Sequence, residues 1–240
     1  MRIGFHSNLG MYLKHPTPAV GAIQVFLGRP ISFTPSEPKD IEYVKDRIKE
    51  LDLKVYVHSP YVFSLKHKTK SWGGINQLQT IMKNIGFEYM VVHCRGEYTV
   101  DEWVDFIDET IDPRMILLEN MANGAFKTLE ELEEISERTG CGICIDTAHL
   151  WNSGDETQIK DWKHVKLVHC NVANGEFGGK VDKHSALSLS EGNVDWVQYR
   201  VLSHVDCDII TEVSAVVGYE KEIQLITKLL ETNYDNKKTV

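Results

Sequence analysis

The sequence predicts one (β/α)8 barrel, of the TIM type, that spans residues 1–240 as a single domain. Eight short runs of apolar and β-branched residues recur along the chain, and most are continuous, as is typical of parallel strands covered on both faces. Helical patterns lie between most of these runs, and 240 residues suit one compact barrel. A doubly wound open sheet is the main alternative, but no glycine-rich phosphate loop follows the first run.

Each of the eight runs has about the length of a buried strand. In chain order, the predicted strands are Arg2–His6, Ala22–Leu27, Lys54–Ser59, Tyr89–Cys94, Met115–Asn120, Gly142–Thr147, Lys166–Asn171 and Asp208–Val213.

The helices between the strands are predicted from apolar residues that step by three and four positions. One such pattern ends at Gly86, a typical C-terminal stop, and capping boxes begin two other helices at Thr99 and Thr128. The first connection, residues 7–21, is too short and too rich in proline and glycine for a full helix, and residues 155–163 hold two turns at most. The clearest apolar patterns are Ile41, Val44, Ile48 and Leu51; Ile75, Leu78, Met82 and Ile85; Val194, Val197 and Val201; and Ile223, Ile226, Leu229 and Leu230.

Two connections are unusually long. Residues 28–39 contain three prolines, and residues 172–192 contain four glycines and no apolar periodicity. Long loops of this kind in compact domains are often functional, so both are expected to serve the site.

The composition predicts a globular protein in a reducing, intracellular compartment. Five cysteines form no CxxC pair, several lie inside apolar runs, and the N-terminus lacks a signal-peptide pattern, so secretion is not expected. No apolar run approaches 18 residues, so no membrane span is expected. The formal net charge of −9 argues against a nucleic-acid partner unless bound cations change the local field.

Ionisable residues follow the apolar part of six consecutive predicted strands. The C-terminal ends of barrel strands meet at one rim, where active sites lie, so these side chains are expected to share a cavity. One such residue alone would be an ordinary rim histidine or helix cap, but the joint pattern of imidazoles and carboxylates predicts a metal site. The predicted ligands are His58, His93, Glu119, Asp146, His149, His169 and Glu212 at the strand ends, with Asp182 and His184 from the long loop.

Nine ligands exceed the three or four that one zinc ion needs, so two or three ions are expected. Such clusters suit the hydrolysis of phosphoesters. His6 ends the first strand and faces the same rim, where a supporting role and a purely structural role are both open.

Several motifs resemble those of the endonuclease IV family of apurinic/apyrimidinic (AP) endonucleases. They are "GAIQVFLGRP", "HSPY", "ENMA", "CIDTAH", "HCN" and "FGGKVDKH" followed by "SEG", and they run in order over nearly the whole chain. The resemblance implies a zinc-dependent DNA repair nuclease of base excision repair, with three Zn²⁺ per chain, partly replaceable by Mn²⁺.

The resemblance also implies which residues share each ion. His58 and His93 would hold the first zinc, Glu119 would bridge to the second, and the remaining ligands would divide between the second and third. Glu119 would orient the metal-bound hydroxide that cuts 5′ to an abasic site, leaving a 3′-OH and a 5′-deoxyribose phosphate. A 3′-phosphodiesterase activity is also implied. The second zinc would take Asp146, His169 and Glu212, and the third His149, Asp182 and His184.

The implied partner is double-stranded DNA that contains an abasic site, bound by a monomer. Three Zn²⁺ would move the formal charge from −9 to −3. Tyr61 and Val62 would enter the gap left by the missing base, as apolar wedges do. The family's DNA-inserting arginine is replaced here by Ile31, with Arg29 nearby. Further cations expected at the rim are Arg95 and Lys183, which with Arg29 form the predicted DNA contacts, and Lys66, Lys68, Lys70 and Lys180.

Two other functions compete with this interpretation. One is a metal-dependent sugar isomerase or epimerase on the same barrel, and the other is a module that binds damaged DNA without cutting it. The trio of His149, Asp182 and His184 argues against the isomerase, and the complete set of predicted ligands argues against the non-cleaving module.

Overall fold

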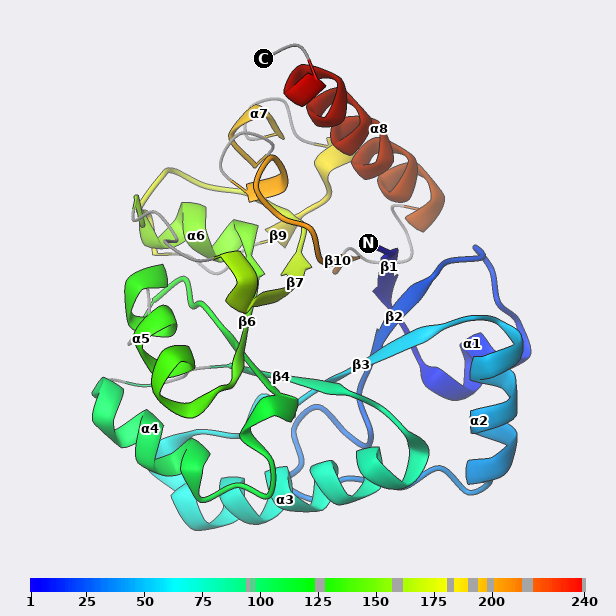
Figure 1. The fold of residues 1–240 in the computed structure, drawn as a ribbon, viewed down its shortest axis with the longest axis vertical. Helices are drawn as coiled ribbons and strands as arrows, with labels where there is room; N and C mark the ends of the chain where they lie inside the picture. The colour runs from blue at the N-terminus through cyan, green and yellow to red at the C-terminus, as the bar shows by residue number, and fades with distance from the viewer. Residues whose placement is uncertain are drawn as a thin grey trace.

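Eight parallel strands close into a barrel in the order β1-β10-β7-β6-β5-β4-β3-β2 (Figure 1). The computed structural model describes residues 1–93, 96, 98–123, 128–156, 162–180, 184–189, 194–197, 201–212 and 218–238. The predicted (β/α)8 fold is confirmed. The barrel strands are β1 Ile3–His6, β2 Ala22–Val25, β3 Lys54–His58, β4 Tyr89–His93, β5 Ile116–Glu119, β6 Gly142–Asp146, β7 Val165–His169 and β10 Asp208–Thr211.

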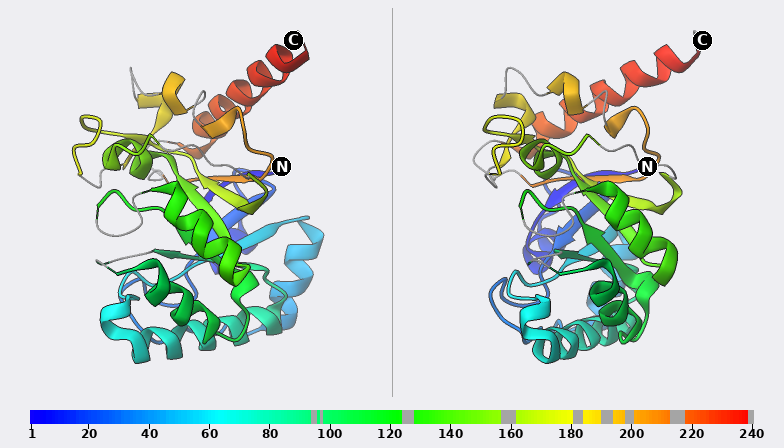
Figure 2. Two further views of the ribbon diagram at one scale, coloured as in Figure 1. Left: turned by 60° about the vertical axis from the view of Figure 1, so that its left-hand side comes forward. Right: turned by 90° about the vertical axis from the view of Figure 1, so that its left-hand side faces the viewer.

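Helices cover the outside of the barrel (Figure 1). Thr99 begins α4 with a complete capping box, and Gly86 ends α3 with a φ of 93°. Figure 2 shows that α8 runs along one side of the barrel and extends beyond it. The helices are α1 Leu9–Lys14, α2 Ile41–Glu50, α3 Lys68–Ile85, α4 Val100–Asp108, α5 Leu129–Thr139, α6 Thr147–Ser153, α7 Val194–Val197 and α8 Tyr219–Lys238, with 3-10 turns η1 Leu65–His67, η2 Pro113–Met115, η3 Trp162–His164 and η4 Leu187–Leu189.

Two local features were not predicted. The helix after the sixth barrel strand is α6, which starts directly at the strand end because the Asp146 side chain accepts a hydrogen bond from the His149 backbone and caps it. The long loop is also not fully irregular, since β8 (Val172–Ala173) pairs antiparallel with β9 (His184–Ser185). This ladder brings His184 back over the end of the barrel.

The barrel interior is a separate small core. It contains Ala22, Tyr56, Val91, Leu117, Cys144, Leu167 and Ile210, one from each barrel strand except β1, while a larger core fills the space between strands and helices. In β1, Gly4 leaves no room for a side chain, because a Cβ there would lie 1.8 Å from the Ala22 carbonyl oxygen. This ring forms a buried, mainly apolar layer beneath the C-terminal ends of the strands.

The opposite end of the barrel is closed by a polar network. Asp208 accepts hydrogen bonds from the Tyr56 hydroxyl at 2.8 Å and the Arg2 backbone at 2.7 Å, and the Lys54 ammonium lies 3.4 Å from it. Burial and the Asp208 carboxylate both raise the pKa of Tyr56. Residues at this end of such barrels support stability rather than catalysis. None of the helices in the described ranges is long and apolar enough to cross a membrane.

Candidate metal centre

The candidate site is the layer of side chains immediately above the interior ring. Side chains along a strand alternate between its two faces, so the residue two positions beyond each ring member also points into the barrel. Seven residues lie two positions after a member of the ring, and in β1 His6 likewise lies two positions after Gly4. They are Gln24, His58, His93, Glu119, Asp146, His169 and Glu212.

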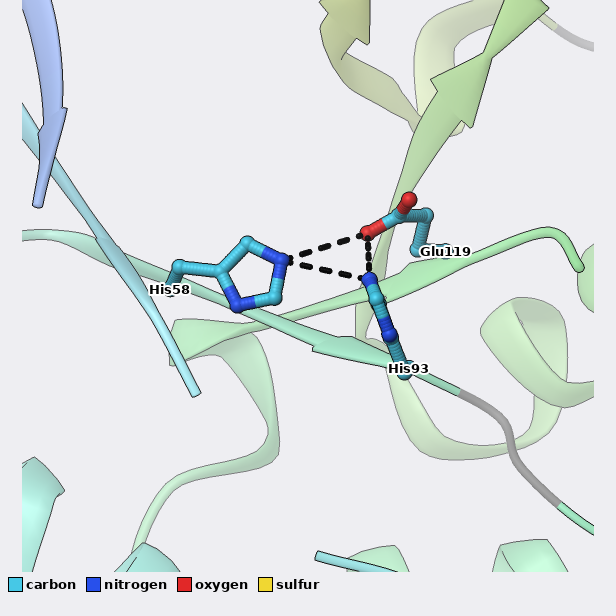
Figure 3. Close-up of side chains that lie close together, drawn as sticks. All are labelled: His58, His93 and Glu119. Atoms are coloured by element: carbon cyan, nitrogen blue, oxygen red, sulfur yellow. Dashed lines mark hydrogen bonds and ion pairs between the residues drawn. The ribbon is translucent and has the colours of Figure 1, made fainter. Parts of the chain in front are cut away.

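The first cluster joins β3, β4 and β5. The Nε2 atoms of His58 and His93 lie 3.2 Å apart and, respectively, 3.8 Å and 2.9 Å from Oε2 of Glu119. All three atoms point toward one another, as Figure 3 shows. Two imidazoles and one carboxylate in this arrangement match the ligand set of a zinc ion.

The second cluster lies on the other oxygen of Glu119. The Nδ1 atom of His169 lies 3.4 Å from Oε1 of Glu119, 3.9 Å from Oδ2 of Asp146 and 3.6 Å from Oε2 of Glu212. Asp146, His169 and Glu212 therefore form a group that could hold a second ion, and the two oxygens of Glu119 face different clusters.

The third cluster forms where α6 meets β9. The Nε2 atoms of His149 and His184 lie 3.2 Å apart, and Oδ2 of Asp146 is 3.9 Å from the latter. Eight of the nine predicted ligands thus converge on one end of the barrel. The ninth, Asp182, lies outside the described residues.

Backbone and amide partners orient the imidazoles. Nδ1 of His58 lies 2.7 Å from the carbonyl oxygen of Ser59, and Nδ1 of His149 lies 2.8 Å from that of Asn120. Each carbonyl can only accept, so Nδ1 carries the proton and Nε2 presents its lone pair to the cluster. The side chains are oriented as metal-ligating histidines usually are.

The unsatisfied atoms of the site fit bound cations. Both oxygens of Glu119 are buried, and neither accepts a hydrogen bond from a backbone, amide or hydroxyl group of the described residues; the groups that approach them are imidazole nitrogens, the nearest being Nε2 of His93 at 2.9 Å. Nδ1 of His169 is also buried and faces only carboxylates and the other groups of the cluster. Leaving a buried polar atom unpaired costs about 1–3 kcal/mol, and more for a charged group. Zinc or a similar cation between these atoms would remove that cost.

The protonation states of His58 and Glu119 suit metal binding, whereas His169 would have to release a proton: burial lowers the pKa of His169, but Cys144, Glu212 and Glu119 together hold it well above its ordinary value. Burial lowers the pKa of His58 to about 3, and the nearby His93 adds to the effect, so His58 is neutral at physiological pH. Burial alone would raise the pKa of Glu119, but His93 and His169 hold it well below its ordinary value. A neutral imidazole and an ionised carboxylate are the forms that bind metal.

The sequence analysis missed several residues that support the ligands. Asn120 binds the Asp146 backbone through both atoms of its amide, at 2.7 Å and 3.0 Å, and Oδ1 of Asn171 accepts from the Glu212 backbone at 2.9 Å. The Thr147 hydroxyl donates to the Asn171 carbonyl. The sequence contained a signal for them, because Asn120 directly follows the predicted ligand Glu119 and Asn171 lies two residues after the predicted ligand His169.

Gln24 and Cys144 were missed as well. Gln24 occupies the same register as the ligands, two positions after Ala22, and its amide contacts both His169 and Glu212. Cys144 lies with Glu119 and His169 in a further cluster of possible ligand atoms. Burial raises the pKa of the Cys144 thiol to about 12, so this sulfur is protonated in the metal-free protein.

A pocket of about 280 Å³ opens above the clusters. Its walls include His6, and Tyr61 stands at its edge with its ring 5.2 Å from that of His58 and 5.4 Å from that of His93. Of the predicted DNA contacts, Tyr61 is partly exposed, Val62 is half-buried and Arg29 is exposed. Arg95 and Lys183 lie outside the described ranges.

Comparisons with known proteins point in the same direction. A family model described as a xylose isomerase-like TIM barrel matches residues 20–206. The "Probable endonuclease 4" of Mycobacterium leprae (strain Br4923) is 30% identical over 200 residues, covering 72% of this chain and 76% of that protein.

Two solved structures share the fold. The endonuclease IV of Thermus thermophilus superposes with a TM-score of 0.79 at 21% identity, covering 98% of this chain and 100% of that one. A D-tagatose 3-epimerase-like protein superposes with a TM-score of 0.72 at 19% identity and full coverage of both chains. The fold is therefore shared by nucleases and epimerases and does not distinguish between them. The sequence similarity does, since the relatives that match in sequence are named as endonucleases. The chain belongs to the endonuclease IV family of the xylose isomerase-like TIM barrels.

Proposed function

We propose that the chain is a zinc-dependent AP endonuclease, which hydrolyses the phosphodiester bond 5′ to an abasic site in double-stranded DNA. The products would be a 3′-OH and a 5′-deoxyribose phosphate. We place it, as a monomer, in intracellular base excision repair. The observation that carries the proposal is the convergence of eight imidazole and carboxylate residues, with the buried Glu119 at their centre, whose two oxygens are approached by imidazole nitrogens from two different clusters.

The clusters suggest how three ions would be shared. His58 and His93 would hold one, Asp146, His169 and Glu212 a second, and Glu119 would bridge them. The third would lie between His149 and His184, with Asp182 completing its ligand set. When bound, the ions would supply Lewis acidity and lower the pKa of a coordinated water, which is the chemistry that phosphodiester hydrolysis needs. Mn²⁺ could replace part of the zinc, since the ligands are nitrogen and oxygen atoms.

The protein's own contribution is to fix these groups before the substrate arrives. Asp146 is held by the α6 cap and by Asn120, and the carbonyl partners fix the orientation of His58 and His149. Such preorganisation avoids the cost of moving charged groups during the reaction. Glu119 has one oxygen facing the His58–His93 cluster and the other facing His169, so its carboxylate would fix the distance between these two clusters.

The surroundings of the pocket suit a DNA substrate. Tyr61 stands at its mouth, and exposed cations lie on the neighbouring segments at Arg29, Lys66 and Lys70. These charges would attract phosphates to one face of a chain whose formal charge is −9. The same site would also remove blocking groups from 3′ ends, because that reaction breaks a bond of the same type.

The test is incision of a duplex that contains one tetrahydrofuran analogue of an abasic site. We expect a cut 5′ to the analogue, its loss after prolonged chelation and its recovery on adding Zn²⁺, with about three zinc ions per loaded chain. Tight binding without a cut would favour the non-cleaving module. Turnover of a ketose or aldose with no cut would favour the isomerase, and one ion per chain would contradict the trinuclear site.

A further inference from the structure

His184 reaches the third cluster from a hairpin whose two strands are very short. β8 and β9 contribute two residues each, and Ala173 pairs with His184. A two-stranded hairpin on its own is at best marginally stable in water. The position of His184 therefore needs support from outside the hairpin. Residues 174–180, which follow β8 and are called the hairpin loop below, make the contacts that can supply it.

The hairpin loop lies against the last turn of α6. The backbone N–H of Gly178 donates to the Trp151 carbonyl at 2.9 Å. The backbone N–H of Lys180 donates to the Asn152 carbonyl at 2.8 Å. In the opposite direction, the indole N–H of Trp151 donates to the Gly175 carbonyl at 3.0 Å. The loop is thus bonded to two consecutive residues of the helix.

The backbone of the hairpin loop is closely fitted to its surroundings. A Cβ at Gly154 would lie 3.0 Å from the Cα of Gly178, so the two chain segments are in direct contact. Lys180 has a φ of 57°, and its carbonyl accepts a hydrogen bond from the Asn123 side chain at 3.3 Å. A left-handed backbone at a residue other than glycine persists only where neighbouring groups hold it. The docked conformation of the loop is therefore specific.

α6 also carries the second imidazole of the third cluster. His149 precedes Trp151 by two positions and Asn152 by three on this helix. Because positions on a helix have a fixed spacing, docking the loop on α6 also places it relative to His149. The separation of 3.2 Å between the Nε2 atoms of His149 and His184 depends on that placement.

Three aromatic rings, called the aromatic seam below, cover the contact between the hairpin loop and α6. Phe177 of the loop meets Trp151 edge to face, with ring centroids 5.3 Å apart and 81° between the planes. Trp196 of α7 lies 5.3 Å from Trp151 and 6.4 Å from Phe177. Edge-to-face pairs of this kind are favourable beyond the area that they bury. Phe177 remains 41% exposed, so its removal would loosen this contact without opening a cavity in the core.

From these observations, and resting on the proposed function, we propose that the aromatic seam is a positioning element that sets the affinity of the third ion. Phe177 holds the hairpin loop on α6, and the loop in turn holds β9 so that His184 faces His149. Without the seam the hairpin would leave this position more often, and the third ion would lose a ligand. The ligands of the first two ions lie at the ends of barrel strands, so their affinities should not depend on the seam.

The test is titration of the metal-free protein with Zn²⁺ in competition with a chelating dye. We expect Phe177→Ala to weaken one of the three ions about tenfold and to leave the other two unchanged. Phe177→Tyr keeps the ring and should retain the affinity of the unmodified protein. Tyr43→Ala is the matched control, because Tyr43 on α2 is also 41% exposed, and it should leave all three affinities unchanged.

A second comparison asks whether the effect passes through His184. In a His184→Ala background, Phe177→Ala should change no metal affinity further, because the ligand that the seam positions is already absent. Coupling between two events is reciprocal, so Zn²⁺ should also slow hydrogen exchange of the Gly178 and Lys180 amides in the unmodified protein. In His184→Ala, Zn²⁺ should leave the exchange of these two amides unchanged.

Three results would overturn the proposal. The first is that Phe177→Ala weakens all three ions equally or none of them. The second is a further loss of affinity in the double variant, and the third is fewer than three ions on the unmodified protein, since the seam would then have no third ion to serve. Three bound ions without incision of abasic DNA would contradict the proposed function instead, because the titration uses no DNA.

Discussion

The amide of Gln24 joins two of the candidate ligands, with Oε1 lying 2.8 Å from Nε2 of His169 and Nε2 donating to Oε1 of Glu212 at 2.8 Å. Because an amide oxygen only accepts, Nε2 of His169 carries the proton. Nδ1 is left to face Glu119 and Asp146, as the nitrogen that would bind a metal ion. Gln24 is fully buried, so bulk water cannot take the place of its amide.

Gln24→Met should therefore weaken metal binding by about 10- to 100-fold, measured by competition with a chelating dye. Gln79→Met is the control, since Gln79 is also fully buried and both ends of its amide are bonded, to Asp112. Both variants should lose stability, but only the first should lose metal. Equal metal affinity in the two variants would remove Gln24 from the site.

The architecture of this site could be predicted because strand periodicity is strict. A residue at the end of a parallel strand points into the barrel or out of it according to its register alone. The candidate ligands at the ends of β3 to β7 each lie two positions after a residue of the interior ring, so assigning the fold is enough to place them together.

Other features depended on contacts that register does not specify. Gln24 occupies a ligand register, but a neutral amide is not a metal ligand, so its role appears only once His169 and Glu212 are seen beside it. The start of α6 was missed because Asp146 is both a strand end and a helix cap. The β8–β9 ladder has only two residues per strand, too few for a recognisable pattern.

His184→Ala should reduce the zinc content by about one ion and abolish incision while the barrel remains folded. His184 reaches the site from the short β9 strand, so its loss removes a ligand without altering the barrel core. Metal analysis and circular dichroism measure the two effects, and His15→Ala, at an exposed histidine, is the control. Asp182→Ala should behave like His184→Ala. Full zinc content and normal cutting in both variants would rule out the third ion.

Ile31→Ala should weaken binding to abasic DNA several-fold without lowering the melting temperature. The side chain is 76% exposed, at the tip of a loop whose Pro30 carbonyl accepts from the Tyr61 backbone, so it lies close to the proposed wedge. Apolar side chains in such positions insert between bases. Ile111→Ala, at an isoleucine that is 51% exposed elsewhere, should leave DNA affinity unchanged. Identical affinities in the two variants would show that Ile31 does not contact DNA.

Asp208→Ala should lower the free energy of unfolding by about 2–4 kcal/mol and leave metal binding intact. The change would leave the buried Tyr56 hydroxyl and the Arg2 backbone N–H without their acceptor. Urea denaturation measures it. Asp52→Asn should have almost no effect, because Asp52 pairs with Arg2 from a side chain that is 92% exposed, and asparagine tolerates the φ of 47° at this position. A loss of metal in Asp208→Ala would contradict the separation of the two barrel ends.

The metal-free protein should become less stable as the pH falls from about 7 to about 5, in part because of His58. Burial, with a contribution from His93, lowers the pKa of His58 from 6.5 to about 3 in the folded state. Between these values the unfolded chain binds a proton that the folded chain does not, so acid favours unfolding, and His58 accounts for about 2 kcal/mol over this range. His58→Gln cannot take up that proton, so its stability should fall less over the same interval in urea denaturation, whereas His15→Gln should follow the unmodified protein. If His58→Gln instead shows the same pH slope as the unmodified protein, then His58 is not held neutral by its burial beside His93.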